Sequence, residues 1–273
     1  MVLRLSPSQV STFFGCPAAY YQRYILGRKI PPGIALHMGT GLHAASDVNF
    51  TQKMASRRDL PRDVFADAAE QAYNERLRDE GVLLPQEDAS RAKLFLEECK
   101  VKTIQMAGVL HDDVAPLVQP IAVEKDVEFT REGVPGVVFA GRLDVLDETH
   151  DVIDIKGSKS KWPAGKAEQE GQPVFYLHGA REYLGTQSKD FIFHVITKGK
   201  TPVHQPVRTT RDESDLLALE EQAKIIVNMR KAGLFPPCDP GHWRCSPVWC
   251  GYYLAGCKYI SRRKRLVYIN REA

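Results

Sequence analysis

The chain has 273 residues, 43% of them apolar, with 37 Lys and Arg against 34 Asp and Glu. This composition excludes a disordered chain, which would be poorer in apolar residues, and a collagen-like chain, which would need far more Gly than 20. No apolar run is long enough to cross a membrane, and Met1–Gln9 lacks the features of a secretory signal, so we expect a cytoplasmic protein with no membrane partner.

Helical patterns occupy the first part of the chain. Ser6-Pro7 is typical of a helix start, and Cys16-Pro17 interrupts the short helix that follows. Beyond a Pro- and Gly-rich link, the spacing of apolar residues predicts helices at about 38–54, 62–78 and 87–110. His43 and Asp47 are four residues apart in the first of these, so they share one helix face.

Strand patterns begin after Pro120. They predict strands at 121–129, 137–146, 152–156, 191–197 and 203–207. Helices are predicted at 172–185 and 212–231. This order indicates an α/β fold with a mixed central sheet and helices packed around it. Since no repeat or linker is visible, we expect one domain over residues 1–273.

Two neighbouring strands carry charged residues inside apolar runs, namely Asp144 on one strand and Asp154 and Lys156 on the next. Because side chains alternate along a strand, Asp154 and Lys156 share one face, and a hairpin would bring Asp144 to it. Two carboxylates suit Mg²⁺ or Mn²⁺. A lysine beside them can orient or help deprotonate a metal-bound water and offset charge in a phosphoryl transition state. The alternative is that both acids lie in turns and Lys156 is solvated.

The motifs that contain these residues occur in a recognisable order: His43 in Gly-Thr-Gly-Leu-His, Asp144 in Gly-Arg-Leu-Asp, Asp154 and Lys156 in Asp-Ile-Lys, and Gln172 and Tyr176 in Gln-Pro-Val-Phe-Tyr. This succession resembles the PD-(D/E)xK nucleases of the RecB/AddB type. The resemblance implies a restriction-endonuclease-like core, at about 119–209.

The same resemblance assigns roles to individual residues. It implies a divalent metal held by His43, Asp144, Asp154 and the main-chain carbonyl of Ile155, with Lys156 supporting the attacking water. Gln172 and Tyr176 would contact the DNA backbone or steady the site. Pro173 places Gln172 at a helix start, which weakens the expected contact of that side chain. Asp47 is either an additional acid of the site or an exposed helix residue. Glu124 is either an extra acidic residue near the site or, as we expect, a residue at an outward strand position.

The six cysteines are unevenly distributed, and no CxxC pair occurs, which argues against zinc. In the family that the chain resembles, one N-terminal and three C-terminal cysteines hold a 4Fe-4S cluster that joins the chain ends. The matching residues here are Cys16, Cys245, Cys250 and Cys257, in a lobe formed by about 1–30 and 222–273. Cys238 is a less favoured ligand, and Cys99 is expected to be a core thiol. Unligated thiols, or a zinc site with His242, are the alternatives.

The positive charge of the chain gathers near its end. Residues 222–271 hold ten Lys and Arg against one acidic residue. We expect DNA phosphates to contact Arg262 and Arg263, and also Lys159 and Lys161 in the loop after the Asp-Ile-Lys motif. The neighbouring tryptophans, Trp243 and Trp249, are expected to pack in the lobe rather than stack on bases.

These observations predict a metal-dependent DNA nuclease, most simply an exonuclease that acts on single- or double-stranded DNA ends. Its candidate partners, besides DNA, are a helicase, a recombinase or another replication or repair protein. The alternative from a different class is a nucleic-acid-binding iron–sulfur component of a recombination, replication or CRISPR complex with a weak or vestigial nuclease centre.

Overall fold

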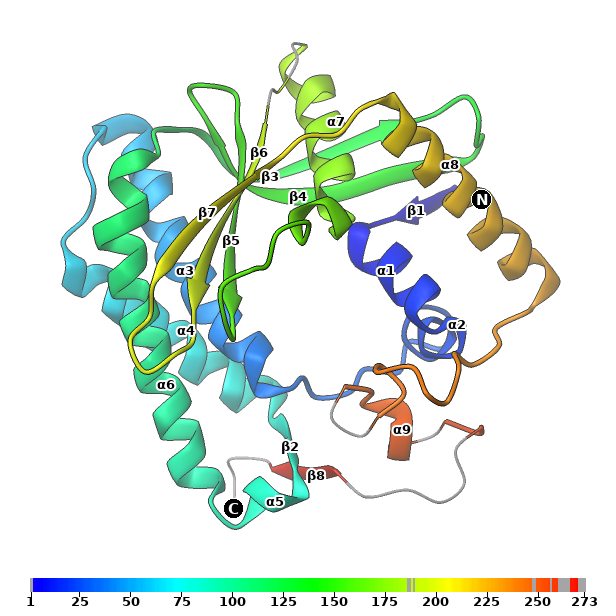
Figure 1. Ribbon diagram of the computed structural model, residues 1–273, viewed down its shortest axis with the longest axis horizontal. Helices are drawn as coiled ribbons and strands as arrows, with labels where there is room; N and C mark the ends of the chain where they lie inside the picture. The colour runs from blue at the N-terminus through cyan, green and yellow to red at the C-terminus, as the bar shows by residue number, and fades with distance from the viewer. Residues whose placement is uncertain are drawn as a thin grey trace.

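A mixed β-sheet lies between two groups of helices, which is the α/β arrangement that the sequence predicts (Figure 1). The computed structural model describes residues 2–185, 188, 190–246, 249–255, 257–259 and 266–269. The strands of the main sheet are β1 (Leu3–Leu5), β3 (Pro120–Thr130), β4 (Val137–Asp147), β5 (Val152–Ser158), β6 (Phe191–Thr197) and β7 (His204–Thr209).

The longer helices are α1 (Pro7–Gly15), α3 (Ile34–Ser56), α4 (Arg62–Glu80), α6 (Ala92–Val109), α7 (Gln172–Leu184) and α8 (Glu213–Ala232). The shorter ones are α2 (Pro17–Tyr20), η1 (Tyr21–Ile25), α5 (Gln86–Ala89), η2 (Leu110–Val114), η3 (Ala115–Leu117), η4 (Ala167–Gln169) and α9 (Tyr252–Ala255). A separate antiparallel pair is formed by β2 (Val82–Pro85) and β8 (Leu266–Ile269). None of the described helices is long and apolar enough to cross a membrane.

The strands of the main sheet run in the order β1-β4-β5-β6-β7, with β3 also paired to β4. The β1–β4 and β5–β6 pairs are parallel, whereas β3–β4, β4–β5 and β6–β7 are antiparallel. A helix crossover, α7, connects the parallel strands β5 and β6, as such a connection requires. The crossover therefore places the start of α7 directly after the strand that carries Asp154 and Lys156.

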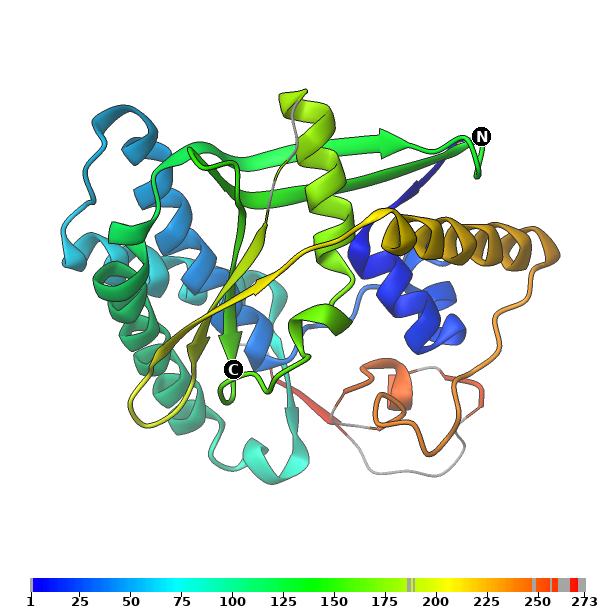
Figure 2. The ribbon, with the colours of Figure 1, turned by 45° about the horizontal axis from the view of Figure 1, so that its top comes forward.

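Helices cover both faces of the sheet (Figure 2), and each face has its own apolar core. Ile153 and Ile155 of β5 pack into the core that α3, α4 and α6 cover. Val152, the aromatic side chains of β6 and the inner side of α7 belong to the opposite core, which α1 and α8 also cover. Burial of these side chains, at roughly 25 cal/mol per Å² of apolar surface, fixes the register of β5 because a one-residue shift would exchange its two faces.

The structure differs from the sequence prediction mainly at short elements. The strand predicted at 191–197 has those bounds, and the helix predicted at 172–185 ends one residue earlier. The strands β1, β2 and β8 are not predicted, because three or four residues show too little alternation. The helix predicted at 87–110 begins at Ala92, after the short α5.

Candidate active site

The hairpin of β4 and β5 brings together the charged residues that the sequence marks on the two strands. The side chain of Asp154 is 1% exposed, and Lys156 Nζ lies 2.9 Å from Asp154 Oδ1 and 2.7 Å from Oδ2. Asp154 and Lys156 share one face because they are two residues apart on a strand. A fully buried carboxylate is costly without a partner, and the ammonium group supplies one.

Asp144 occupies a gap between the same two strands. The pairing of β4 with β5 covers only two positions, Val145 with Ile153 and Leu146 with Val152. Beyond them, the Ile155 N–H donates to Asp144 Oδ2, at 3.2 Å, in place of a backbone carbonyl. The same oxygen lies 3.2 Å from His43 Nδ1, so α3 contributes His43 to the site from a distant part of the sequence.

The protonation of these groups follows from their burial and mutual contacts. Burial favours the neutral imidazole, but the charge and the hydrogen bond of Asp144 outweigh it and raise the pKa of His43 to about 9. Despite burial, His43 keeps the pKa of Asp144 below its ordinary value. Burial raises the pKa of Asp154, and the charge of Asp144 adds to that rise. Burial disfavours the ammonium, yet Asp154 and Asp144 raise the pKa of Lys156. Lys156 therefore stays cationic.

The first two turns of α7 support the acids. Pro173 stands at the helix start, where its missing N–H removes no helix hydrogen bond. Gln172 Nε2 donates to Asp154 Oδ1 at 3.5 Å, and the Gln172 side chain also hydrogen-bonds Tyr176. Burial raises the pKa of Tyr176 to about 12, so its phenol stays protonated. Despite its position at the helix start, Gln172 reaches the site.

Two further acids lie beside the site. Asp47, one turn after His43, has a buried Oδ1 with no hydrogen-bond partner, and burial together with the charge of Glu124 raises its pKa to about 7. The expectation of an outward strand position for Glu124 is wrong: its backbone has φ +47° and its charge acts on Asp47 and Asp144. The strand pattern of the sequence does not reveal this conformation, because a positive φ is uncommon for a glutamate and leaves no mark in the alternation of side chains.

The donor chemistry of the site fits a hard cation. Two buried carboxylates and the carbonyl of Ile155 are the oxygen ligands that Mg²⁺ and Mn²⁺ prefer. Asp154 Oδ2 makes no hydrogen bond among the described residues, although Lys156 lies at ion-pair distance. No three His, Cys, Asp or Glu side chains in the described ranges form a ready-made metal site. The acids are instead paired with His43 and Lys156, and a metal held through His43 must displace the imidazole proton.

Basic residues predicted to contact phosphate lie partly outside the described chain. Lys159 and Lys161 are exposed in the loop after β5, and neither has an ion-pair partner among the described residues. They come three and five residues after Lys156, so the loop adds positive charge just beyond the strand that carries Asp154. Arg262 and Arg263 lie outside the described residues.

Pairwise interactions link five of the six cysteines where the two ends of the chain meet, although no three of them form a ready-made metal site among the described residues. The Cys238 N–H donates to Cys16 Sγ at 3.4 Å, and the Cys238 thiol hydrogen-bonds Cys16 and Cys245. Cys250 interacts electrostatically with Cys16 and Cys257. Burial and these neighbours raise the pKa of Cys250 to about 11, so it remains a thiol until a metal takes its proton.

The remaining cysteine and the tryptophans complete the comparison with the sequence. Cys99 is buried in the core on α6, as expected. The expectation that Trp243 and Trp249 pack in the lobe is wrong, because they are 57% and 66% exposed. Two half-exposed indoles side by side are unusual on the surface of a globular protein, where exposed apolar patches mark binding sites.

With this geometry in view, the comparisons with known proteins identify the class. Residues 4–262 match the model of the PD-(D/E)XK nuclease superfamily, and the chain belongs to that superfamily. Its members hydrolyse phosphodiester bonds, typically with Mg²⁺ or Mn²⁺, so the chain has the fold and lineage of a nuclease.

One solved structure shows the fold relationship. The crystal structure of "Putative exonuclease" from Eubacterium rectale has a TM-score of 0.59 and 14% identity, with 89% of this chain and 86% of that chain covered. The crystal structure of SSO0001 has a TM-score of 0.35 and 13% identity, with 90% and 96% covered. At such identities, similarity concerns the fold alone. No curated protein matches the sequence at a significant level.

Proposed function

We propose that this protein is a divalent-metal-dependent deoxyribonuclease of the RecB/AddB type that acts on DNA ends, with all of residues 1–273 in one nuclease domain. The observation that carries the proposal is the convergence of His43 from α3, Asp144 from β4, and Asp154 and Lys156 from β5. The alternative, in which both acids lie in solvated turns, does not account for two buried carboxylates that are paired with an imidazole and an ammonium group.

The proposed roles follow from these contacts. His43, Asp144, Asp154 and the Ile155 carbonyl would hold Mg²⁺ or Mn²⁺. When bound, the metal supplies a Lewis acid for the phosphate and lowers the pKa of a coordinated water. Lys156 carries its positive charge into the site, where it offsets negative charge that develops on the phosphate.

Gln172 and Tyr176 of α7 help to hold the Asp154 carboxylate in place. Gln172 holds one carboxylate oxygen through its amide and connects it to Tyr176. Since Tyr176 stays protonated, it can donate a hydrogen bond to a phosphate oxygen but cannot serve as a base near neutral pH. Lys159 and Lys161 would then hold the DNA backbone beside the scissile bond.

A comparison of linear with circular DNA as substrates tests for exonuclease action. We expect the protein to degrade linear DNA with Mn²⁺ and to leave covalently closed circular DNA of the same sequence intact, because the reaction starts at ends. Cleavage of the circle at a rate equal to that of the linear form would show an endonuclease. EDTA should stop the reaction on both substrates.

A second candidate function has its own supporting observation. The cysteines and basic residues near the chain ends would suit a nucleic-acid-binding assembly component whose nuclease centre is vestigial. That function predicts DNA binding without cleavage of either substrate at any Mn²⁺ concentration. The intact set of Asp144, Asp154 and Lys156 favours the nuclease.

We also propose that Cys16, Cys245, Cys250 and Cys257 hold a 4Fe-4S cluster, for which four thiolates are the ordinary ligands. Backbone and side-chain hydrogen bonds already join the two chain ends there: Ala18 N–H donates to the Pro236 carbonyl at 3.0 Å, and Tyr252 Oη donates to the Arg28 carbonyl at 2.7 Å. Cys238, in contact with Cys16 and Cys245, is the neighbour that a ligand assay must distinguish from them.

The position of Tyr176 leads to a test of the α7 residues. A Cβ atom at Gly141 would lie 2.6 Å from Tyr176 Cε1, so Gly141→Ala must displace the ring. We expect a loss of about 1–3 kcal/mol in unfolding free energy and a fall of about tenfold to a hundredfold in DNA degradation. Denaturant unfolding and initial rates on end-labelled DNA measure the two effects.

The matched control is Gly171→Ala, one residue before α7. Gly171 has φ −81° and open space where a Cβ would lie, so this substitution should preserve both stability and rate. A Gly141→Ala protein as active as the Gly171→Ala protein would remove Tyr176 from the account of the site.

A further inference from the structure

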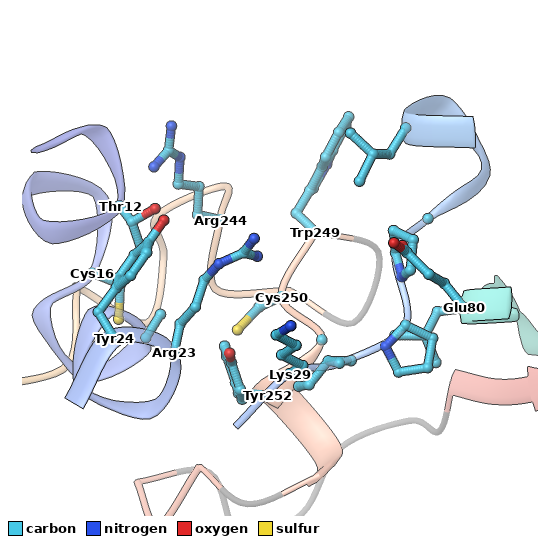
Figure 3. Close-up of a pocket in the computed structure, with 18 of the residues that line it drawn as sticks. Thr12, Cys16, Arg23, Tyr24, Lys29, Glu80, Arg244, Trp249, Cys250 and Tyr252 are labelled. Atoms are coloured by element: carbon cyan, nitrogen blue, oxygen red, sulfur yellow. The ribbon is translucent and has the colours of Figure 1, made fainter. Parts of the chain in front are cut away.

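A large pocket separates the start of α3 from the C-terminal lobe. It has a volume of about 1050 Å³, at the upper limit of sites that bind small molecules. Its wall comes from η1, the segment before α3, the end of α4 and the lobe around Trp249 (Figure 3). Cys16 and Cys250 also line it, which places the proposed cluster in its wall.

Aromatic rings line this pocket from both sides. Tyr24 lies on the η1 side and Trp249 on the opposite side, with Tyr252 below them in the view of Figure 3. Trp243 also lines the pocket and meets Trp249 edge to face, with ring centroids 5.5 Å apart. His242 stacks on the Trp243 ring at 5.7 Å between ring centroids, whereas the described residues show no side chain stacked on Trp249. Because Trp249 is also more than half exposed, its ring face is available to a planar ligand.

Cations accompany these rings. Arg23 and Lys29 extend toward the middle of the pocket (Figure 3), and neither has an ion-pair partner in the described part of the chain. Arg244 donates to the Ser11 carbonyl at 2.7 Å, and its guanidinium lies 5.0 Å from the centre of the Trp243 ring.

The acids of the pocket are confined to one end. Asp79 and Glu80 lie at the end of α4, where Arg76 pairs with Glu80 at 3.2 Å. The η1 side and the lobe therefore carry the net positive charge. An anionic polymer fits there.

We infer that this pocket binds a single-stranded segment of the DNA substrate; this inference rests on the proposed function and specifies its substrate. Unpaired bases stack on aromatic side chains while basic groups neutralise the phosphates, and this binding is tolerant of sequence. A duplex cannot use such rings, because its base faces are already stacked on one another. Such a strand explains both the exposed Trp249 ring and the cations that have no acidic partner among the described residues.

Binding is measured on the full chain in an Asp144→Ala background with EDTA, so that no DNA is cleaved. The probes are a labelled oligothymidylate and a blunt duplex of equal length, followed by fluorescence anisotropy. Lys29→Glu and Trp249→Ala should each weaken oligothymidylate binding about fivefold or more and leave duplex binding unchanged. Lys29→Glu should also reduce the slope of log affinity against log salt by about 0.7.

Two further variants serve as controls. Lys93→Glu makes the same charge change at an exposed position of α6 and should bind as the background protein does. Trp249→Phe should restore most of the affinity that Trp249→Ala loses, since a ring remains to stack. Unchanged oligothymidylate binding in both Lys29→Glu and Trp249→Ala would overturn the inference, as would equal losses for the strand and the duplex, or no binding of either probe.

The outcome is separable from that of the proposed function. If the wild-type protein degrades DNA with Mn²⁺ while the pocket variants bind oligothymidylate normally, strand binding in the pocket is refuted and the nuclease function stands. If the wild-type protein cleaves no DNA but strand binding depends on Lys29 and Trp249, the nuclease function is refuted and strand binding in the pocket stands.

Discussion

Asp154→Asn should reduce metal-dependent DNA degradation by more than about 100-fold and should abolish metal-induced stabilisation. Loss of residues that merely orient metal ligands already costs about 10–100-fold, and Asp154 is a proposed ligand itself. Metal that binds only the folded state raises the melting temperature, so Mn²⁺ should stabilise the wild type and leave the variant unchanged. Thermal melting with and without Mn²⁺ gives a readout that does not depend on activity.

The fold should survive this substitution. Burial and Asp144 raise the pKa of Asp154 in the folded protein, so ionisation of this carboxyl costs folding free energy as pH rises above its unfolded pKa, and a neutral amide removes that cost. Asp126→Asn is the matched control, because Asp126 is an exposed strand aspartate that pairs with Arg142 at 2.8 Å, outside the acid cluster. An Asp154→Asn protein that Mn²⁺ stabilises as much as the wild type would exclude Asp154 as a ligand.

Cys16→Ser should remove the iron and destabilise the protein. Cys16 is the proposed ligand from the N-terminal end, so its loss would remove the link that the cluster makes between the two chain ends and leave only the hydrogen bonds there. Each kcal/mol of stability lost lowers the melting temperature of a domain of this size by about 2–4 °C, and a structural cluster should account for several kcal/mol. Iron and sulfide content, absorbance of anaerobically purified protein and thermal melting measure the effect.

The other cysteines make this experiment specific. Cys99→Ala removes a buried core thiol on α6 and should retain iron, with at most a small loss of stability. Cys238→Ala distinguishes a ligand from a neighbour: we expect it to retain iron. A colourless wild-type protein with stoichiometric zinc would refute the cluster, and full iron content in Cys16→Ser would exclude Cys16 as a ligand.

The fold was predictable where side-chain periodicity is strong. The alternation around Asp154 predicts the shared face with Lys156, and apolar spacing places His43 on a helix. The sequence contains no comparable signal for the separation of β4 from β5, which lets Asp144 accept a hydrogen bond from the Ile155 N–H. That contact depends on the residue at which the β4–β5 hydrogen bonding ends, and this is set by the packing of the whole fold rather than by the local sequence.

The sequence predicts which residue types make up the C-terminal lobe, but it does not predict how they contact one another. Cysteine spacing indicates a cluster of thiols, and the structure brings Cys238 into contact with Cys16. Trp243 and Trp249 illustrate the limit of composition, because an indole is as compatible with a core as with a stacking surface until its neighbours are known. Glu124 is a similar case, since its backbone conformation decides which way the carboxylate faces.

The most direct test of the central claim compares the wild type with Asp144→Ala and Lys156→Ala in the degradation of end-labelled single- and double-stranded DNA, with Mg²⁺, with Mn²⁺ and with EDTA. We predict degradation by the wild type with metal, none with EDTA, and none by either variant, with circular dichroism spectra of both variants like those of the wild type. Full activity in a folded Asp144→Ala or Lys156→Ala protein would contradict the assignment of this site as the nuclease centre.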